Sequence, residues 1–120
     1  MILSGGFTIH NLGDFACFSE TTARPQYKAF DQAILDAVTI EDVSCSRHSA
    51  ADVLADQSLS SQPTSRKQAM FNLTNHPGFR MAQPREDHLV PLYIAAGAGE
   101  GGDVKVLSAI YGSPTFAFGV

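Results

Sequence analysis

Histidines are the side chains of this 120-residue chain that could most readily do chemistry. There are four of them: His10, His48, His76 and His88. Imidazole is the usual side chain for proton transfer near neutral pH and the commonest metal ligand. His48 lies in a polar run and is expected at the surface. His76 precedes a proline in a turn, which favours a structural or exposed role and leaves a substrate contact as the alternative.

His10 and His88 occupy more informative positions. His10 follows an apolar run and a Gly-Gly turn, the kind of strand end at which α/β proteins place functional groups. His88 is predicted on the apolar side of a helix, with Leu92 and Ala95. Each could be a satisfied core histidine, but together they could supply neutral imidazoles to a divalent metal. Because 78 positions separate them, only the fold decides whether they meet.

Several familiar catalytic signatures are absent from the chain. It has no HExxH zinc motif, no P-loop, no GxSxG nucleophile elbow and no CxxC pair. A Gly-rich run covers residues 97–102, but it follows a predicted helix instead of a strand. We therefore expect this run to end the helix and not to bind a dinucleotide.

The elements that must position the histidines follow from hydrophobic periodicity and turn signals. The predicted strands cover residues 1–3, 104–106 and 115–118, and the predicted helices cover 26–43, a stretch from Ser49, 66–73, and Pro84 to about Gly97. Asp31 falls on the polar face of the first helix, and Met70 and Phe71 are the expected packing residues of the third. Pro91 would kink the last helix. The sequence thus predicts an α/β fold, a partial α/β sandwich with a few strands and three to four helices.

Composition places the chain among globular proteins and excludes some functions. A hydrophobic fraction of 44% and a charged fraction of 17% disfavour disorder. The net charge of −4 disfavours a nucleic-acid partner, which needs a basic face. No apolar run reaches the ~20 residues that span a bilayer, and no leader is recognised, so we expect no membrane partner. The two cysteines form no disulfide framework, which predicts a cytoplasmic protein.

Two segments resemble motifs of one enzyme family. Residues 4–12 read SGGFTIHNL and resemble the SGxxxHNL motif of the class III extradiol ring-cleavage dioxygenases, with one residue more before the histidine. Residues 83–92 read QPREDHLVPL and are similar to that family's (H/N)PxxEHxLPL segment. The resemblance is strongest to the family's single-chain, DOPA-dioxygenase-like branch. It implies an α/β fold and a reaction that opens a catechol-type aromatic ring with O2.

The resemblance also implies roles for individual residues. The family holds a mononuclear non-haem Fe(II), or Zn(II) in some members, and His88 would be a ligand of this metal. His10 would be the catalytic histidine, either a ligand of the metal or a neighbour of its ligands, that moves protons on the substrate and the bound oxygen. His76 and Asn11 are weaker candidates for substrate contacts. The implied partners are a small aromatic diol and O2.

The family's remaining metal ligands come from N-terminal motifs resembling HGSP and SxHW, and neither occurs here. Glu86 and Asp87 would flank the site, with Asp87 where the family usually has Glu, and one of them could turn in as a further ligand. The resemblance therefore implies that residues 1–120 are the C-terminal portion of a larger catalytic domain, with residues 57–65 as a loop insertion. A missing N-terminal half, or a second copy in a homo-oligomer, would supply the other ligands.

Two alternatives to an enzyme remain open. One is a non-enzymatic remnant or interaction module that keeps half of the fold. It predicts exposed apolar strand edges around residues 1–3 and dimerisation through them. The other is an unrelated small α/β fold. The dioxygenase prediction differs from both because it requires the imidazoles of His10 and His88 to converge in one cleft.

Overall fold

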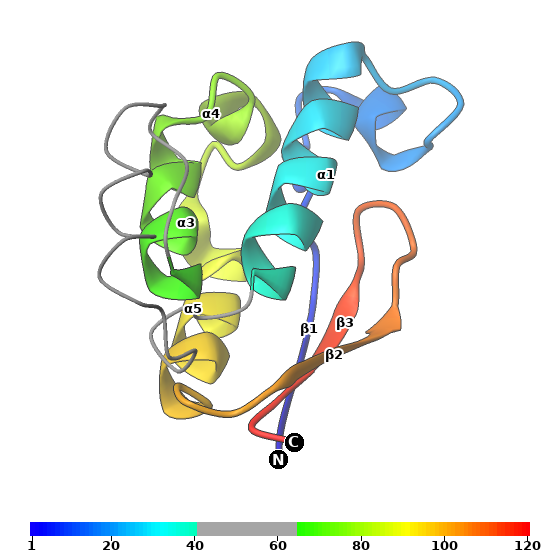
Figure 1. Cartoon of the computed structure of the whole chain (residues 1–120). Helices are drawn as coiled ribbons and strands as arrows, with labels where there is room; N and C mark the ends of the chain where they lie inside the picture. The colour runs from blue at the N-terminus through cyan, green and yellow to red at the C-terminus, as the bar shows by residue number, and fades with distance from the viewer. Residues whose placement is uncertain (41–64) are drawn as a thin grey trace, which may run out of the picture.

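The computed structural model describes residues 1–40 and 65–120 (Figure 1). The elements of this part are, in order, β1 (Ile2–Gly5), the 3-10 helix η1 (Phe15–Phe18), α1 (Pro25–Thr39), α3 (Arg66–Asn72), η4 (Leu73–Asn75), α4 (Phe79–Ala82), η5 (Glu86–His88), α5 (Val90–Ala98), β2 (Val104–Ser108) and β3 (Thr115–Phe118). Four α-helices and one three-stranded sheet confirm the predicted α/β class for these residues. The predictions for His48, for a helix from Ser49 and for a loop at 57–65 lie mostly or wholly outside the described residues.

The sheet pairs the first strand of the chain with the last. Its order is β1-β3-β2, and both pairs of strands are antiparallel. Phe118 is opposite Ile2 on one side and Val104 on the other, so the register is defined across all three strands. The two ends of the chain therefore lie side by side in Figure 1. All three strands predicted from apolar runs are confirmed, with slightly different limits.

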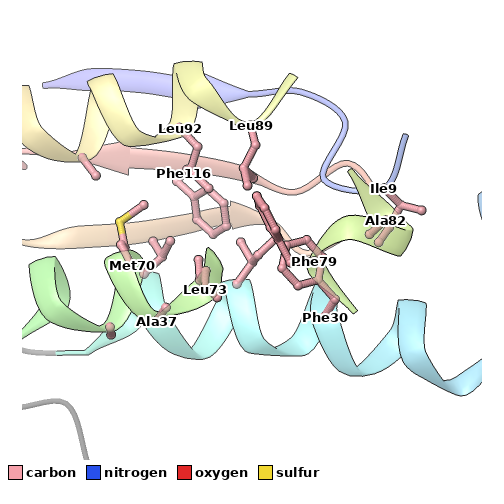
Figure 2. Packing of buried hydrophobic residues seen from close by; sticks show 14 of the residues in the cluster. Ile9, Phe30, Ala37, Met70, Leu73, Phe79, Ala82, Leu89, Leu92 and Phe116 are labelled. Atoms are coloured by element: carbon pink, nitrogen blue, oxygen red, sulfur yellow. The ribbon is translucent and has the colours of Figure 1, made fainter. Parts of the chain in front are cut away.

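The hydrophobic core lies where α1, α3 and α5 pack with the sheet. Because side chains alternate along a strand, Phe116 and Phe118 share one face of β3, and both are fully buried. Figure 2 shows Phe116 beside Leu89 and Leu92, and Phe30 of α1 beside Phe79. The buried stripe of α1 has the predicted spacing of three to four residues and consists of Tyr27, Phe30, Asp31, Ile34, Ala37 and Val38.

The sequence prediction for the segment before α5 is wrong. Periodicity predicts one helix from Pro84 with a kink at Pro91, but the structure has the short η5 and then α5, which begins at Val90. Pro91 lies in the first turn of α5, where its missing N–H would have had no helical partner. A kink is therefore unnecessary. His88 precedes the helix and is exposed, instead of lying on its apolar side.

Two other side chains differ from their predicted burial. The sequence places Asp31 on the polar face of α1, but Asp31 is only 6% exposed. Phe71 is expected to pack inward with Met70, yet Phe71 is 60% exposed while Met70 is buried. Neighbouring positions of a helix point about 100° apart, and in α3 it is Met70 that points to the core and Phe71 that points to solvent.

Exposed apolar residues lie on the edge strand β1 and just before it. Met1 is 80% and Leu3 is 60% exposed, as the interaction-module alternative predicts. Among the described residues, no helix has the length and apolar character required to cross a membrane.

Candidate active site

The fold brings the imidazoles of His10 and His88 together. The centres of the two rings are 3.9 Å apart, and the ring planes are inclined by 42°. His10 is half-buried and His88 is exposed. The structure therefore places at one point the two side chains for which the family resemblance implies a shared site.

The turn after β1 directs the chain towards His88. Gly6 has φ +149°, a backbone conformation that side-chain-bearing residues rarely adopt. A Cβ built on Gly6 would be 3.7 Å from the carbonyl oxygen of His88, so the two backbones approach closely here. The backbone N–H of His10 then donates to the carbonyl of Ala82 at 2.8 Å. These contacts hold the His10 segment against the segment that leads to His88.

Asp31 anchors the same segment from the side of α1. Its Oδ1 accepts hydrogen bonds from Thr8 Oγ1 at 2.8 Å and from the backbone N–H of Gly112 at 3.1 Å. Thr8 also donates its backbone N–H to the carbonyl of Gly112 at 3.0 Å. Burial raises the pKa of Asp31, although these two hydrogen bonds act in the opposite direction. Asp31 therefore joins α1, the His10 segment and the turn between β2 and β3.

Aromatic side chains surround the two imidazoles. The ring centre of Phe7 is 6.1 Å from that of His10 and 6.2 Å from that of His88. Phe18 of η1 meets His10 edge-on, with 6.4 Å between ring centres. Edge contacts of this kind are favourable for aromatic rings. The two imidazoles are thus held among hydrocarbon faces on one side of the molecule.

A pocket of about 360 Å³ opens beside the imidazole pair. It is lined by His10, Asn11, Leu12, Gly13, Pro84, Arg85, Asp87 and His88. This volume is at the lower end of the range for small-molecule sites. Arg85 and Asp87 bring one positive and one negative charge to the rim. The pocket is therefore of a size for a small molecule, and both histidines contribute to its wall.

Asn11, a predicted substrate contact, lines this pocket but has its amide engaged elsewhere. Its Nδ2 donates to the Tyr27 hydroxyl at 3.1 Å and to the Met81 carbonyl at 3.0 Å. Its Oδ1 accepts from the backbone N–H of Gly13 at 2.9 Å. The visible role of Asn11 is to shape the turn after His10, and its contact with a substrate stays a prediction.

His76, the other weak candidate, is not among the residues that line the pocket. Its Nδ1 accepts a hydrogen bond from the backbone N–H of Gly78 at 3.0 Å, and its ring centre is 5.5 Å from that of Phe30. These contacts agree with the structural alternative for His76. They hold the turn between η4 and α4.

Three side chains of types that can bind a metal line the pocket. Two imidazoles and the Asp87 carboxylate line its wall. Across residues 1–40 and 65–120, no group of three or more His, Cys, Asp or Glu side chains is arranged to hold a metal ion. The side chain of Glu86 lies outside the part that the structure describes. Open catalytic metal sites typically use three protein ligands, and these three side chains are not arranged as such a set.

Asp31 and Gln83 are residues of this region that sequence reasoning missed. Asp31 has the pattern of a solvated helix position, and Gln83 enters only as the first residue of a motif. A polar residue inside an otherwise apolar stripe was the available signal for Asp31, because buried polar groups need partners. For Gln83 the sequence carried no such signal.

One curated protein supports the family resemblance. The chain is 36% identical over all of its 120 residues to the 4,5-DOPA dioxygenase extradiol-like protein of Schizosaccharomyces pombe. It spans about a third of the length of this relative, 34%. No protein-family model and no solved structure matches the chain. The similarity supports a likeness to the DOPA dioxygenase-like extradiol proteins for the part of them that this chain covers.

Proposed function

We propose that this chain forms part of the catalytic site of a metal-dependent extradiol dioxygenase, which opens the ring of a catechol-type aromatic with O2. The observation that carries the proposal is the meeting of His10 and His88, whose ring centres are 3.9 Å apart at the wall of a pocket. The similarity to a 4,5-DOPA dioxygenase extradiol-like protein supports the same conclusion.

His88 is the proposed ligand of the metal, which is Fe(II) with Zn(II) as the alternative. Such a metal, when bound, supplies Lewis acidity for the diol and, in the case of Fe(II), redox chemistry with O2. His88 is suited to this role because its ring is exposed at the pocket wall. The following residue, Leu89, is 1% exposed and fixes the backbone beside it.

His10 is the proposed proton carrier. Its ring lies against His88 and between Phe7 and Phe18, so it is held in place and partly shielded from water. An imidazole can accept a phenolic proton and return it later in the same reaction near neutral pH. At the pocket wall, His10 is positioned to do this for a substrate hydroxyl.

The remaining ligands are proposed to come from protein outside this chain. Among the described residues, the His, Cys, Asp and Glu side chains that line the pocket are those of His10, His88 and Asp87. The chain spans about a third of its relative, so most of that relative has no counterpart here. We propose that an N-terminal part, or a second copy of the chain, completes the site.

Metal binding provides the direct test. The chain and its His88→Ala, His10→Ala and His76→Ala variants are loaded anaerobically with Fe(II), and bound iron is measured after desalting. We expect His88→Ala to lower the affinity by roughly tenfold or more and His76→Ala to leave it unchanged, because His76 is not among the residues that line the pocket. Equal iron in the parent and in His88→Ala would contradict the proposal. Ring cleavage is then assayed with DOPA, after addition of the N-terminal part of the relative.

A specific observation favours a non-enzymatic interaction module as the second candidate. Leu3 on β1 and Met1 just before it are exposed, and β1 forms one edge of the sheet. An uncovered apolar edge is a site for pairing with another chain. Sedimentation of the parent and of Leu3→Lys separates the candidates: a dimer that Leu3→Lys dissociates, in a parent that binds no metal, favours the module.

A further inference from the structure

The side-chain amide of Gln83 connects the two segments that carry the histidines. Gln83 directly follows α4 and is completely buried. Its Nε2 donates to the carbonyl of Phe7 at 3.0 Å and to the carbonyl of Thr8 at 2.7 Å. His10 follows Thr8 by two positions, and His88 follows Gln83 by five. A single side chain therefore bridges the approaches to both imidazoles.

A backbone hydrogen bond supports the same connection. The N–H of His10 donates to the carbonyl of Ala82 at 2.8 Å. Three hydrogen bonds thus join residues 7–10 to residues 82–83, and the Gln83 amide makes two of them. Removing that amide would leave the two segments with one of these three bonds.

The other half of the Gln83 amide is unsatisfied. Its Oε1 is buried, and no donor among the described residues forms a hydrogen bond with it. A buried acceptor without a partner costs about 1–3 kcal/mol. Turning the amide over would bring Oε1 against the two carbonyl oxygens of Phe7 and Thr8, so the two donated bonds alone determine its orientation. The unpaired Oε1 costs free energy. The role of the Gln83 side chain is therefore better explained by the two carbonyls that its N–H groups hold in place than by a contribution to stability.

We infer that Gln83 is a positioning residue, whose amide sets the separation of the His10 and His88 rings. The inference rests on the proposed function in one respect: it assumes that the separation of the two rings matters because both rings belong to one site. Small changes of geometry are costly for such sites, because ligands and proton carriers act over distances of a hydrogen bond or a coordinate bond. Asp31 does not connect the two histidine segments in this way. Its carboxylate accepts hydrogen bonds from Thr8 and Gly112, and neither of these residues belongs to the segment before His88.

The test compares variants that lose side-chain hydrogen bonds to backbone carbonyls at two different places in the fold. Gln83→Met keeps the length of the side chain and removes both donors. Gln83→Asn keeps the amide but shortens its reach, and it serves if the Met variant does not fold. The control is Tyr93→Phe, which removes the hydroxyl that donates to the Met70 carbonyl at 2.6 Å, between α5 and α3.

Two measurements are made on each folded variant. Nuclear Overhauser contacts between the ring protons of His10 and His88 report their separation in the metal-free chain. Zn(II) affinity, measured by competition with a chromogenic chelator, reports whether the pair still acts as one site. We expect both Gln83 variants to lose the ring–ring contacts and to bind Zn(II) roughly tenfold more weakly, and Tyr93→Phe to retain both properties.

The outcomes separate this inference from the proposed function. Ring–ring contacts that persist in both Gln83 variants, with Zn(II) affinity as in the parent, overturn the positioning role. A parent that shows the contacts but binds no Zn(II) argues against the proposed function, while loss of the contacts in the Gln83 variants still supports the positioning role. Loss of the contacts in Tyr93→Phe as well would attribute the effect to general loosening and overturn the inference.

Discussion

Asp31 offers the sharpest test of how the fold holds the His10 segment. The carboxylate is 6% exposed, and its Oδ1 accepts one hydrogen bond from the Thr8 hydroxyl and one from the Gly112 N–H. Substitution by leucine keeps a side chain of similar size and removes both acceptors. Substitution by asparagine keeps an oxygen at Oδ1 and removes the charge. The two variants therefore separate loss of the hydrogen bonds from loss of the charge.

The expected energies follow from the two groups that leucine would strand. A buried donor without a partner costs about 1–3 kcal/mol, so the Thr8 hydroxyl and the Gly112 N–H together cost about 2–6 kcal/mol. Relief from burying a carboxylate offsets part of this. We expect Asp31→Leu to lower the free energy of unfolding by about 2–4 kcal/mol, and Asp31→Asn to change it by less than about 1 kcal/mol at neutral pH.

The pH dependence of this difference has a definite sign. Burial raises the pKa of Asp31 above its value in the unfolded chain. The folded state therefore binds the proton more tightly, and the stabilisation from that proton is lost as the pH rises through the folded pKa. The asparagine side chain does not titrate, so we expect Asp31→Asn to gain stability relative to the parent as the pH rises above about 4, the ordinary titration range of an aspartate.

Urea unfolding at several pH values, followed by circular dichroism, measures both effects. The reasoning is refuted if Asp31→Leu and Asp31→Asn destabilise the chain equally, because the hydrogen bonds would then contribute nothing. A difference between the parent and Asp31→Asn that is independent of pH would refute the assignment of a raised pKa. Ring–ring contacts of His10 and His88, recorded for the same variants, show whether the anchor also affects the pocket.

Further predictions use pairs of matched positions. Phe116→Ala empties a core site that is 1% exposed and should cost about 3–5 kcal/mol in urea unfolding, whereas Phe71→Ala, at a site 60% exposed, should cost less than about 0.5 kcal/mol. Equal costs would contradict the described core. Gly99→Ala would place a Cβ 2.5 Å from the Cβ of Phe118, and we expect it to lower the thermal midpoint, with a loss on the order of 2 kcal/mol. Gly97→Ala, in α5 with nothing within 4 Å of the new Cβ, should instead raise stability by up to about 1 kcal/mol. A lower midpoint for Gly97→Ala than for Gly99→Ala would show that this packing is wrong.

Local patterns in the sequence predicted the helices and strands well wherever a single rule for secondary structure applied. The apolar runs near both ends form strands, and the spacing of Tyr27, Phe30, Ile34 and Val38 correctly predicted the inward face of α1. The prediction failed before α5, where two local rules competed. Periodicity extended the helix back to residue 84, but a proline is more favourable in the first turn than in the interior, and the helix begins at Val90.

The candidate site depended on information that local patterns do not carry. The sequence by itself determined that His10 follows a strand and a glycine turn, because this feature depends on near neighbours along the chain. It predicted His88 inside the last helix, whereas the structure places His88 just before α5. The sequence did not determine that the rings of His10 and His88 lie 3.9 Å apart. That proximity needs the hydrogen bonds of Gln83 to the carbonyls of Phe7 and Thr8, which join positions about 75 residues apart. Such partners are selected only when the chain packs, since a buried polar group bonds with whichever donor or acceptor the tertiary structure places beside it.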